Sequence, residues 1–482
     1  MKIDCLPEPE LEFGTGRHVD IRFGLMNHGP LDVGAATAPA RIRCGIVGTP
    51  ETLESLVGWL ERCRSEVAGK ASEKPNLFPR FPGFNEDAAF RSSLVLEPRL
   101  QRTVSQRALD DLCSKAEHDE AVKAAVGVFR GEFEHLVQNA TVDILICAVP
   151  RVVEELMAPE NPGDDGQPPT RSRAGKVDFH HLLKAAAMDL AKPVQLILPA
   201  TYDPTKRRRQ KKRPERQRQL QDEATIAWNI FTAMYYKAGG APWRLVREST
   251  QLASCFVGVA FYQALDSSSL RTSMAQVFDE RGDGLIIRGA PVQLSKEDLQ
   301  PHLSEEDASK LLKEALAQYR AEHKNLPARV VMYKTSTYSD AELRGFKAAA
   351  RGERVETTEF ISTGRSLSEA RLFRNGAYPP LRGTFLSLDQ RSQLLYTRGS
   401  VPFFATYPGM YVPRPFVFRC EDVEETPRHL AAEILALTKM NWNDTQFDGS
   451  EPITVEAARR VGQILKYVEE GGRVAPRYSF YM

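Results

Sequence analysis

Short apolar segments alternate with amphipathic segments along the first half of this 482-residue chain, and this alternation restricts the possible folds more than any other feature. RIRCGIVG (41–48), TVDILICAVP (141–150) and VQLILP (194–199) have the length and composition of buried β-strands. Residues 51–69 place apolar side chains at helical spacing. Apolar strands that are separated by helices indicate an α/β fold with a parallel sheet.

The alternation begins again beyond Pro242, so we place a domain boundary near residue 245. Five strand candidates follow: CFVGVAFY (255–262), GLIIRG (284–289), RVVMYK (329–334), GTFLSL (383–388) and QLLYTRG (393–399). Three helix candidates cover residues 305–323, 428–440 and 454–470. Residues 1–40 are rich in Gly and Pro and predict an irregular or short-stranded lead-in.

The composition is that of an ordinary globular protein, with 42% apolar and 26% charged residues. No stretch reaches the roughly 18 uncharged apolar residues of a membrane helix. Acids and prolines in MKIDCLPEPELEF argue against a signal peptide. We therefore expect a cytoplasmic protein with no membrane partner, whose seven cysteines are free and mostly buried thiols.

One segment concentrates positive charge in a nearly neutral chain. KRRRQKKRPERQRQ (206–219) contains nine Lys or Arg and one Glu, whereas the whole chain has a net charge of +1. Clustered cations release counterions from nucleic acid, so the segment indicates a backbone contact. A solvated loop or an import signal would have the same composition. The residues assigned to the backbone contact are Arg207, Arg208, Arg209, Lys211 and Lys212.

Two helices are predicted beside the third strand candidate. Asp178 can cap a helix that runs to about Ala191. After the basic segment, a helix over residues 221–237 has acids at its start and a lysine at its end, which suits the helix dipole. Gly239 and Gly240 stop it.

Four side chains on these elements can donate hydrogen bonds to a phosphate. His180 and Lys184 are four residues apart and share one helical face. Gln195 opens an otherwise apolar strand, and Lys237 ends the later helix. Each residue alone also fits an ordinary surface or helix-terminal role, so only their spacing as a set indicates a site.

This spacing resembles that of short prokaryotic Argonautes, which consist of a MID and a PIWI domain. The MID pocket of that family has a His or Tyr, a Lys four residues later, a Gln further along, and a Lys before Gly-Gly in a later helix. His180, Lys184, Gln195 and Lys237 match these positions. Longer stretches that resemble the family are residues 13–32, 227–245, 437–454 and YSFYM (478–482).

The resemblance implies a lead-in segment (1–40), a MID domain with a Rossmann-like parallel sheet (41–245) and an RNase H-like PIWI domain (246–482). It implies that the four matching side chains hold the 5′ phosphate of a guide strand. It also implies Mg²⁺ at that phosphate, held with the help of the carboxylate of Met482, because a hard cation can bridge carboxylate and phosphate oxygens. The alternating residues of YSFYM predict a short docked strand.

Slicing members of the family hold two metal ions with a set of carboxylates. Ala260 stands at the place of the first aspartate and Thr335 at the place of the second. The last position falls near EAARR, where Glu456 is the nearest acid. We therefore expect no catalytic residue and no enzymatic activity in this chain. The alternative is a guide-directed nuclease with a relocated carboxylate set, for which the nearby acids are Asp266, Asp279 and Asp283.

The resemblance implies a recognition subunit of a prokaryotic immune system. We expect it to bind a guide, RNA in preference to DNA, and to pair it with single-stranded DNA of an invader. Pairing would activate a separate effector chain that carries an APAZ region, in a heterodimer. That effector is expected to be an NADase, sirtuin-like first and TIR next, so that recognition depletes NAD. A regulator that binds nucleic acid without an effector is a further alternative.

Overall fold

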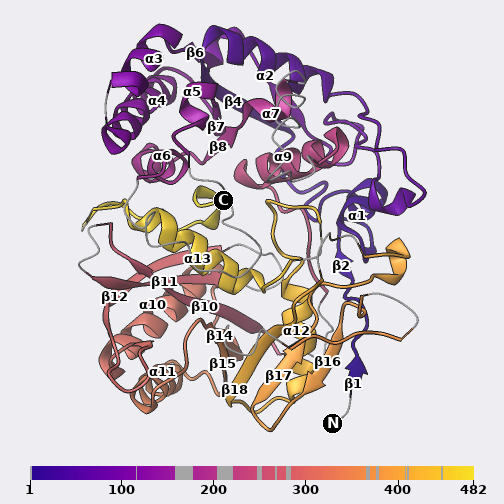
Figure 1. The fold of residues 1–482 in the computed structure, drawn as a ribbon, viewed down its shortest axis with the longest axis vertical. Helices are drawn as coiled ribbons and strands as arrows, with labels where there is room; N and C mark the ends of the chain where they lie inside the picture. Colours follow the sequence, from indigo (N-terminus) through magenta and orange to yellow (C-terminus); the bar gives the residue numbers. More distant parts are fainter. Residues whose placement is uncertain are drawn as a thin grey trace.

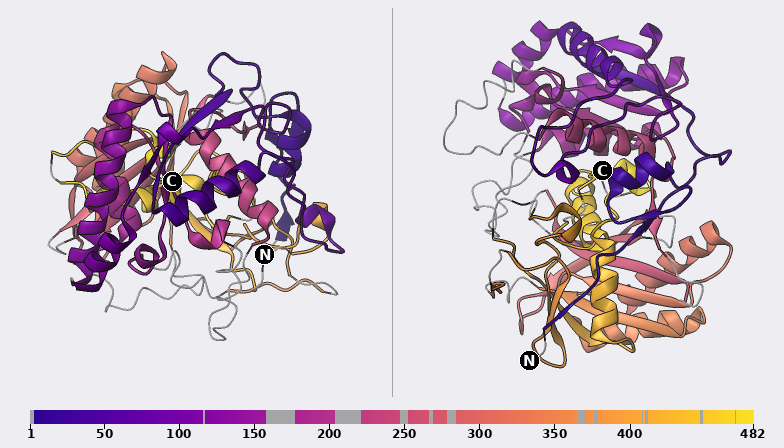
Figure 2. Two further views of the ribbon diagram at one scale, coloured as in Figure 1. Left: turned by 90° about the horizontal axis from the view of Figure 1, so that it is seen from above. Right: turned by 90° about the vertical axis from the view of Figure 1, so that its right-hand side faces the viewer.

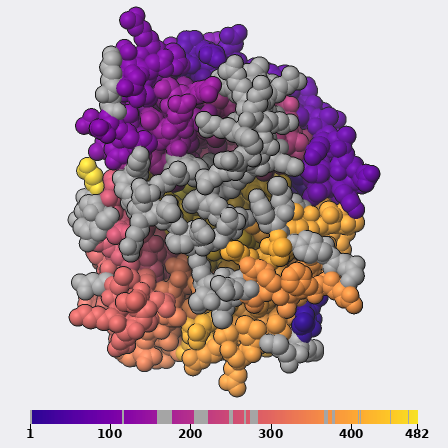
Figure 3. Space-filling view, viewed as in Figure 1, coloured from indigo at the N-terminus to yellow at the C-terminus, as the bar shows by residue number. Residues whose placement is uncertain are grey.

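The computed structural model places the chain in two α/β bodies, one above the other in Figure 1. It describes residues 3–482 apart from 116, 158–176, 204–220, 247–251, 266–268, 278–283, 365–369, 376–378, 408, 410–411, 447–448 and 470. In the space-filling view, residues coloured indigo to magenta form the upper body, and residues coloured orange form much of the lower one (Figure 3). None of the described helices has the length and apolar character that crossing a bilayer requires.

The upper body contains a five-stranded parallel sheet in which β4 and β7 are central. Its strands are β4 (Arg41–Gly48), β5 (Ser93–Val95), β6 (Gln101–Thr103), β7 (Ile144–Ala148) and β8 (Val194–Ile197). The order is β5-β4-β7-β8, and β6 also pairs with β4. The three strands predicted in this half are thus confirmed as β4, β7 and β8.

Helices pack against both faces of this sheet. Its helices are α2 (Pro50–Arg62), α3 (Gln106–Lys115), α4 (His118–Asn139), α5 (Arg151–Glu154), α6 (Phe179–Ala186), α7 (Pro199–Tyr202) and α9 (Glu223–Lys237). Ile144 and Ile146 of β7 belong to one core together with residues of α2 and α9. Leu145 and Cys147, which point to the opposite face, belong to another core with residues of α4 and α6.

The lower body contains a mixed sheet in the order β1-β16-β17-β18-β15-β14-β10-β11-β12-β13. Its strands are β1 (Ile3–Cys5), β10 (Ser254–Gln263), β11 (Leu270–Val277), β12 (Gly284–Leu294), β13 (Pro301–His302), β14 (Arg329–Lys334), β15 (Thr357–Thr363), β16 (Thr384–Ser387), β17 (Ser392–Leu395) and β18 (Phe416–Asp422). All five strands predicted in this half are confirmed. β10, β14 and β15 are parallel to one another at its centre.

Two pairs of helices pack on opposite faces of the lower sheet. α10 (Glu305–His323) and α11 (Asp340–Gly352) share a core with Val257 and Val259 of β10. α12 (Pro427–Leu437) and α13 (Ile453–Leu465) belong to a core that includes Ala260. A side chain at Gly258 would meet the main-chain oxygen of Thr454 at 2.0 Å, so α13 lies directly on β10.

The lead-in runs from the lower body, where the N-terminus lies, up to the other body (Figure 2). β1 pairs with β16, whereas β2 (Leu11–Glu12) joins β3 (Arg17–His18) and β9 (Arg244–Leu245) in a small sheet. α1 (Ile21–His28) follows. The buried Lys439 donates to the main-chain oxygens of Pro9 and Val19 and to Glu8. The lead-in is therefore anchored to the lower body by a lysine that lies just after α12.

One detail of the sequence prediction changes, and another is confirmed. α6 ends at Ala186 and not near Ala191, because a 3₁₀ turn over Met188–Leu190 follows and Ala191 adopts a left-handed conformation (φ 55°). All seven cysteines are free, as predicted, and five of them are buried. Burial raises the pKa of the Cys44 and Cys147 thiols, so they stay protonated and inert.

Candidate functional site

The first part of the site is the N-terminal half of α6. The Asp178 side chain caps the helix by accepting a hydrogen bond from the His181 amide, as predicted. Phe179 and Leu183 enter the core of the upper body. This fixes the helical face that carries His180 and Lys184, and it leaves the Lys184 side chain only 3% exposed.

The second part is the end of α9, whose side chains are almost all buried. Lys237 is its last residue, and Gly239 (φ 98°) turns the chain away in a conformation that favours glycine. The Lys237 ammonium donates to the Gln195 side-chain oxygen at 2.5 Å and to the Val194 carbonyl at 3.2 Å. The structure therefore brings Lys237 and Gln195 together, as the spacing predicted.

The third part comes from the lower body. Residues 478–482 do not form the predicted strand: Tyr478–Phe480 is a 3₁₀ turn, η6, closed by the Tyr481 amide on the Tyr478 carbonyl at 2.8 Å. This turn buries Met482, whose main-chain oxygen accepts from Lys237 at 3.1 Å and from Lys184. Two buried ammonium groups thus share one oxygen between the two bodies.

Positive charge accumulates in this site, which we call the lysine pocket (His180, Lys184, Gln195, Lys237 and the main-chain oxygen of Met482). Burial, followed by the Lys184 and Arg460 charges, holds the pKa of Lys237 well below its ordinary value. Burial and then the Lys184 charge also lower the pKa of His180 well below its usual range. Cations that destabilise one another in this way favour an added anion.

Arg460 is a residue of this site that sequence reasoning missed. It lies on α13, where its guanidinium pairs with Glu456 at 2.8 Å, and its charge lowers the pKa of both His180 and Lys237. In the sequence, Arg460 is one of two arginines in EAARR with no distinguishing signal. Its place near the pocket follows from the packing of α13 against α6.

Ala260 and Thr335, which the sequence places at the first two carboxylate positions, lie close together in the lower body. Ala260 is buried within β10, and Thr335, the residue after β14, donates its amide to the Val259 carbonyl at 3.0 Å, so the two residues lie on neighbouring strands. The Ser273 hydroxyl lies 2.8 Å from the Ala458 carbonyl of α13 and 3.3 Å from that of Ala260. The two positions predicted to lack a carboxylate are therefore neighbours, and α13, which carries Glu456, packs against the same strands.

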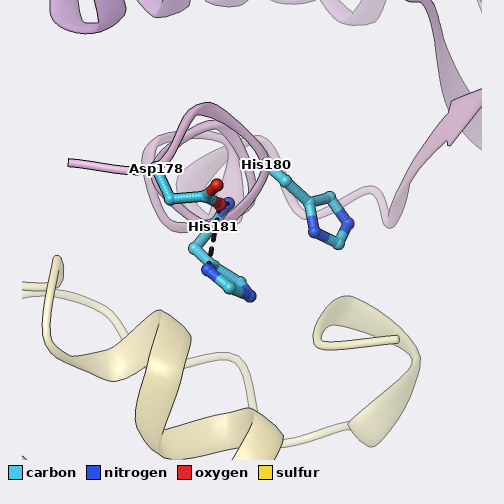
Figure 4. A group of neighbouring side chains, drawn as sticks. All are labelled: Asp178, His180 and His181. Atoms are coloured by element: carbon cyan, nitrogen blue, oxygen red, sulfur yellow. Dashed lines mark hydrogen bonds and ion pairs between the residues drawn. The ribbon is translucent and has the colours of Figure 1, made fainter. Parts of the chain in front are cut away.

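The carboxylate of Glu456 is engaged by Arg460 and by Asn441 at 3.2 Å. Several predicted residues lie outside the described part of the chain. These are the basic residues Arg207, Arg208, Arg209, Lys211 and Lys212, and the acids Asp266, Asp279 and Asp283. Within the described part, one group of His, Cys, Asp or Glu could hold a metal ion, and it consists of Asp178, His180 and His181 (Figure 4).

The architecture is similar to that of solved structures. One is Clostridium butyricum Argonaute bound to a guide DNA (5′ deoxycytidine) and a 19-mer target DNA, with a TM-score of 0.67, 13% identity, and coverage of 100% of this chain and 55% of that chain. The chain has an Argonaute-like fold. Drosophila Piwi is also similar, with a TM-score of 0.56, 13% identity, and coverage of 99% of this chain and 55% of that chain. No protein-family model and no curated protein matches the sequence.

These likenesses confirm the predicted fold class, a parallel MID-type sheet followed by a mixed PIWI-type sheet. The chain spans about half the length of the Argonaute and Piwi chains that it matches. In this Argonaute-like fold the lysine pocket lies where the two bodies meet, and each body supplies part of it.

Proposed function

We propose that the chain binds the phosphorylated 5′ end of a guide strand in the lysine pocket. The observation that carries the proposal is the pair of buried ammonium groups of Lys184 and Lys237, which share the main-chain oxygen of Met482. Two buried cations that share one acceptor favour a further anion, and a phosphate offers several charged acceptors. Gln195 adds an amide donor and His180 an imidazole.

The guide would then pair with a nucleic-acid target. The Argonaute from Clostridium butyricum binds guide and target DNA, which supports nucleic acid as the partner class. Following the resemblance to short Argonautes, we propose an RNA guide, a single-stranded DNA target from an invader, and a cytoplasmic heterodimer with an APAZ-containing effector. A sirtuin-like or TIR NADase is the proposed effector, and its activation would deplete NAD.

We propose that this chain does not cleave its target. Ala260 and Thr335 offer no carboxylate to a metal ion, and they lie on adjoining strands, Ala260 within β10 and Thr335 directly after β14. Glu456 alone, engaged by Arg460 and Asn441, does not make a two-metal site.

Mg²⁺ at the pocket belongs to the same proposal. The oxygen donors offered by the chain are the main-chain oxygen of Met482 and the Gln195 side chain, and lysines already donate to both. This donor set fits a hard cation only when the guide phosphate contributes further oxygens. The ion would then offset the negative charge of the phosphate.

The test uses the purified chain, a guide with a 5′ phosphate or a 5′ hydroxyl, and a labelled complementary DNA. We expect tighter binding of the phosphorylated guide and guide-dependent capture of the target, which stays intact with Mg²⁺ or Mn²⁺. Reproducible cleavage, abolished by replacing an acid near Ala260, would instead establish the nuclease alternative. Equal binding of both guides would reject the phosphate pocket.

A further inference from the structure

We infer that Asp178, His180 and His181 form a binding site for a transition-metal ion such as Zn²⁺, next to the lysine pocket. Each side chain offers one ligand atom, and these atoms lie within 4.8 Å of one another. All three project from the start of α6, above the C-terminal segments (Figure 4). The inference rests on the proposed function in one respect only, since a guide phosphate is expected to supply a further ligand.

The first turn of α6 holds these side chains in place. The Asp178 carboxylate caps the helix, and the His181 Nδ1 lies 2.9 Å from Asp178 Oδ1. The rings of His180 and His181 are 5.2 Å apart. Ligands at about 2.1 Å from a tetrahedral metal are about 3.4 Å from one another, so small side-chain rotations would complete the site.

The donor set selects the class of metal. Two imidazoles and one carboxylate suit Zn²⁺, Co²⁺ or Mn²⁺, whereas Mg²⁺ prefers oxygen ligands only. The ligands differ from the Met482 carboxylate predicted from the sequence.

The surrounding charge makes this site depend on an anion. Three positive charges surround His180, and they belong to Lys184, Lys237 and Arg460. The Lys466 ammonium lies near the Asp178 carboxylate. A dication therefore binds weakly to the protein alone. A bound phosphate would offset these charges and fill the fourth coordination position, so metal and phosphate should strengthen each other's binding.

The experiment titrates the full chain with Co²⁺ as a spectroscopic probe, with and without a 5′-phosphorylated oligonucleotide. We expect one Co²⁺ per chain and tighter binding when the phosphorylated strand is present. His181→Ala and Asp178→Asn should each weaken Co²⁺ binding by at least about tenfold. Asn remains a good helix cap, so the second variant keeps α6 intact. His135→Ala, which replaces an exposed histidine of α4, is the matched control and should leave the affinity unchanged.

Co²⁺ binding that is absent, or equally strong in the wild type and His181→Ala, would overturn the metal site. The guide preference of the same samples separates this failure from a failure of the proposed function. A chain that prefers phosphorylated guides without binding Co²⁺ retains the proposed function and loses the metal site. A chain that binds Co²⁺ through His181 and prefers neither guide retains the metal site and loses the proposed function.

Discussion

At the scale of single residues, His180 shows how the pocket opposes protonation. Burial and the Lys184 charge lower its pKa in the folded chain, whereas an unfolded chain takes up this proton near pH ~6.5. As pH falls through that range, the unfolded state therefore binds more protons than the folded state. Stability rises with pH wherever this holds, so His180 makes the folded protein less stable in acid.

His180→Gln should remove this part of the acid sensitivity. We expect the difference in denaturation midpoint between about pH 7 and about pH 5.5 to be smaller in the variant than in the wild type, because Gln cannot bind a proton in this range. Urea denaturation of the guide-free chain at both pH values measures it. His135→Gln, on the exposed face of α4, is the control. Identical pH dependence in His180→Gln and wild type would show that His180 is not held neutral.

At the scale of elements, strands with strong apolar character were predictable and local turns were not. β7 and β14 are continuous buried runs, so length and composition sufficed to identify them. α11 was not among the predicted helices, because its buried face consists mainly of the small residues Gly345, Ala349 and Ala350 and has Phe346 as its one large apolar side chain. The alternating side chains of YSFYM predicted a strand, but a hydrogen bond from the Tyr481 amide to the Tyr478 carbonyl closes a 3₁₀ turn in this segment.

Some residues of the candidate site could likewise be predicted from the sequence, and others could not. The family resemblance, applied to the spacing of residues along the chain, predicted that Lys184, Gln195 and Lys237 share a site. This was possible because each residue lies on an element whose face or end is set by its own sequence. Arg460 could not be predicted, because its proximity results from the packing of two helices that are far apart in the sequence.

The C-terminal turn provides a matched pair of tyrosines. The buried Tyr481 hydroxyl donates to the Ala475 carbonyl at 2.9 Å, whereas the buried Tyr478 hydroxyl has no hydrogen-bond partner in the described part of the chain. Tyr481→Phe should cost about 1 kcal/mol of unfolding free energy and weaken guide binding by loosening Met482. Tyr478→Phe should be neutral or slightly stabilising. Chemical denaturation compares them, and equal losses in both variants would contradict the role of the Tyr481 hydrogen bond.

At the scale of the whole molecule, the pocket joins the two bodies. Lys184 and Lys237 belong to the upper body, whereas Met482 and Arg460 belong to the lower one. A guide phosphate bound there would contact both, so guide binding should raise the stability of the entire chain. The strand would then leave the pocket toward other contacts, for which the basic segment is the candidate.

Replacing Arg207, Arg208, Arg209, Lys211 and Lys212 with Ser should weaken guide binding regardless of sequence. Each lost phosphate contact should also reduce the slope of log affinity against log salt by somewhat less than one unit for a single strand. Affinities measured across a range of salt concentrations test this. An unchanged slope would favour a solvated loop.

The most direct test of the central claim compares guides that differ only at the 5′ end. Affinities of a 5′-phosphorylated and a 5′-hydroxyl strand are measured for the wild type, for Lys237→Ala, and for Lys310→Ala on the exposed face of α10 as control. A charge-assisted hydrogen bond contributes about 1.5–3 kcal/mol, so Lys237→Ala should weaken the phosphorylated guide by roughly one to two decades. The hydroxyl guide should change little, which also shows that the variant is folded. Equal weakening of both guides would contradict a 5′-phosphate pocket at Lys237.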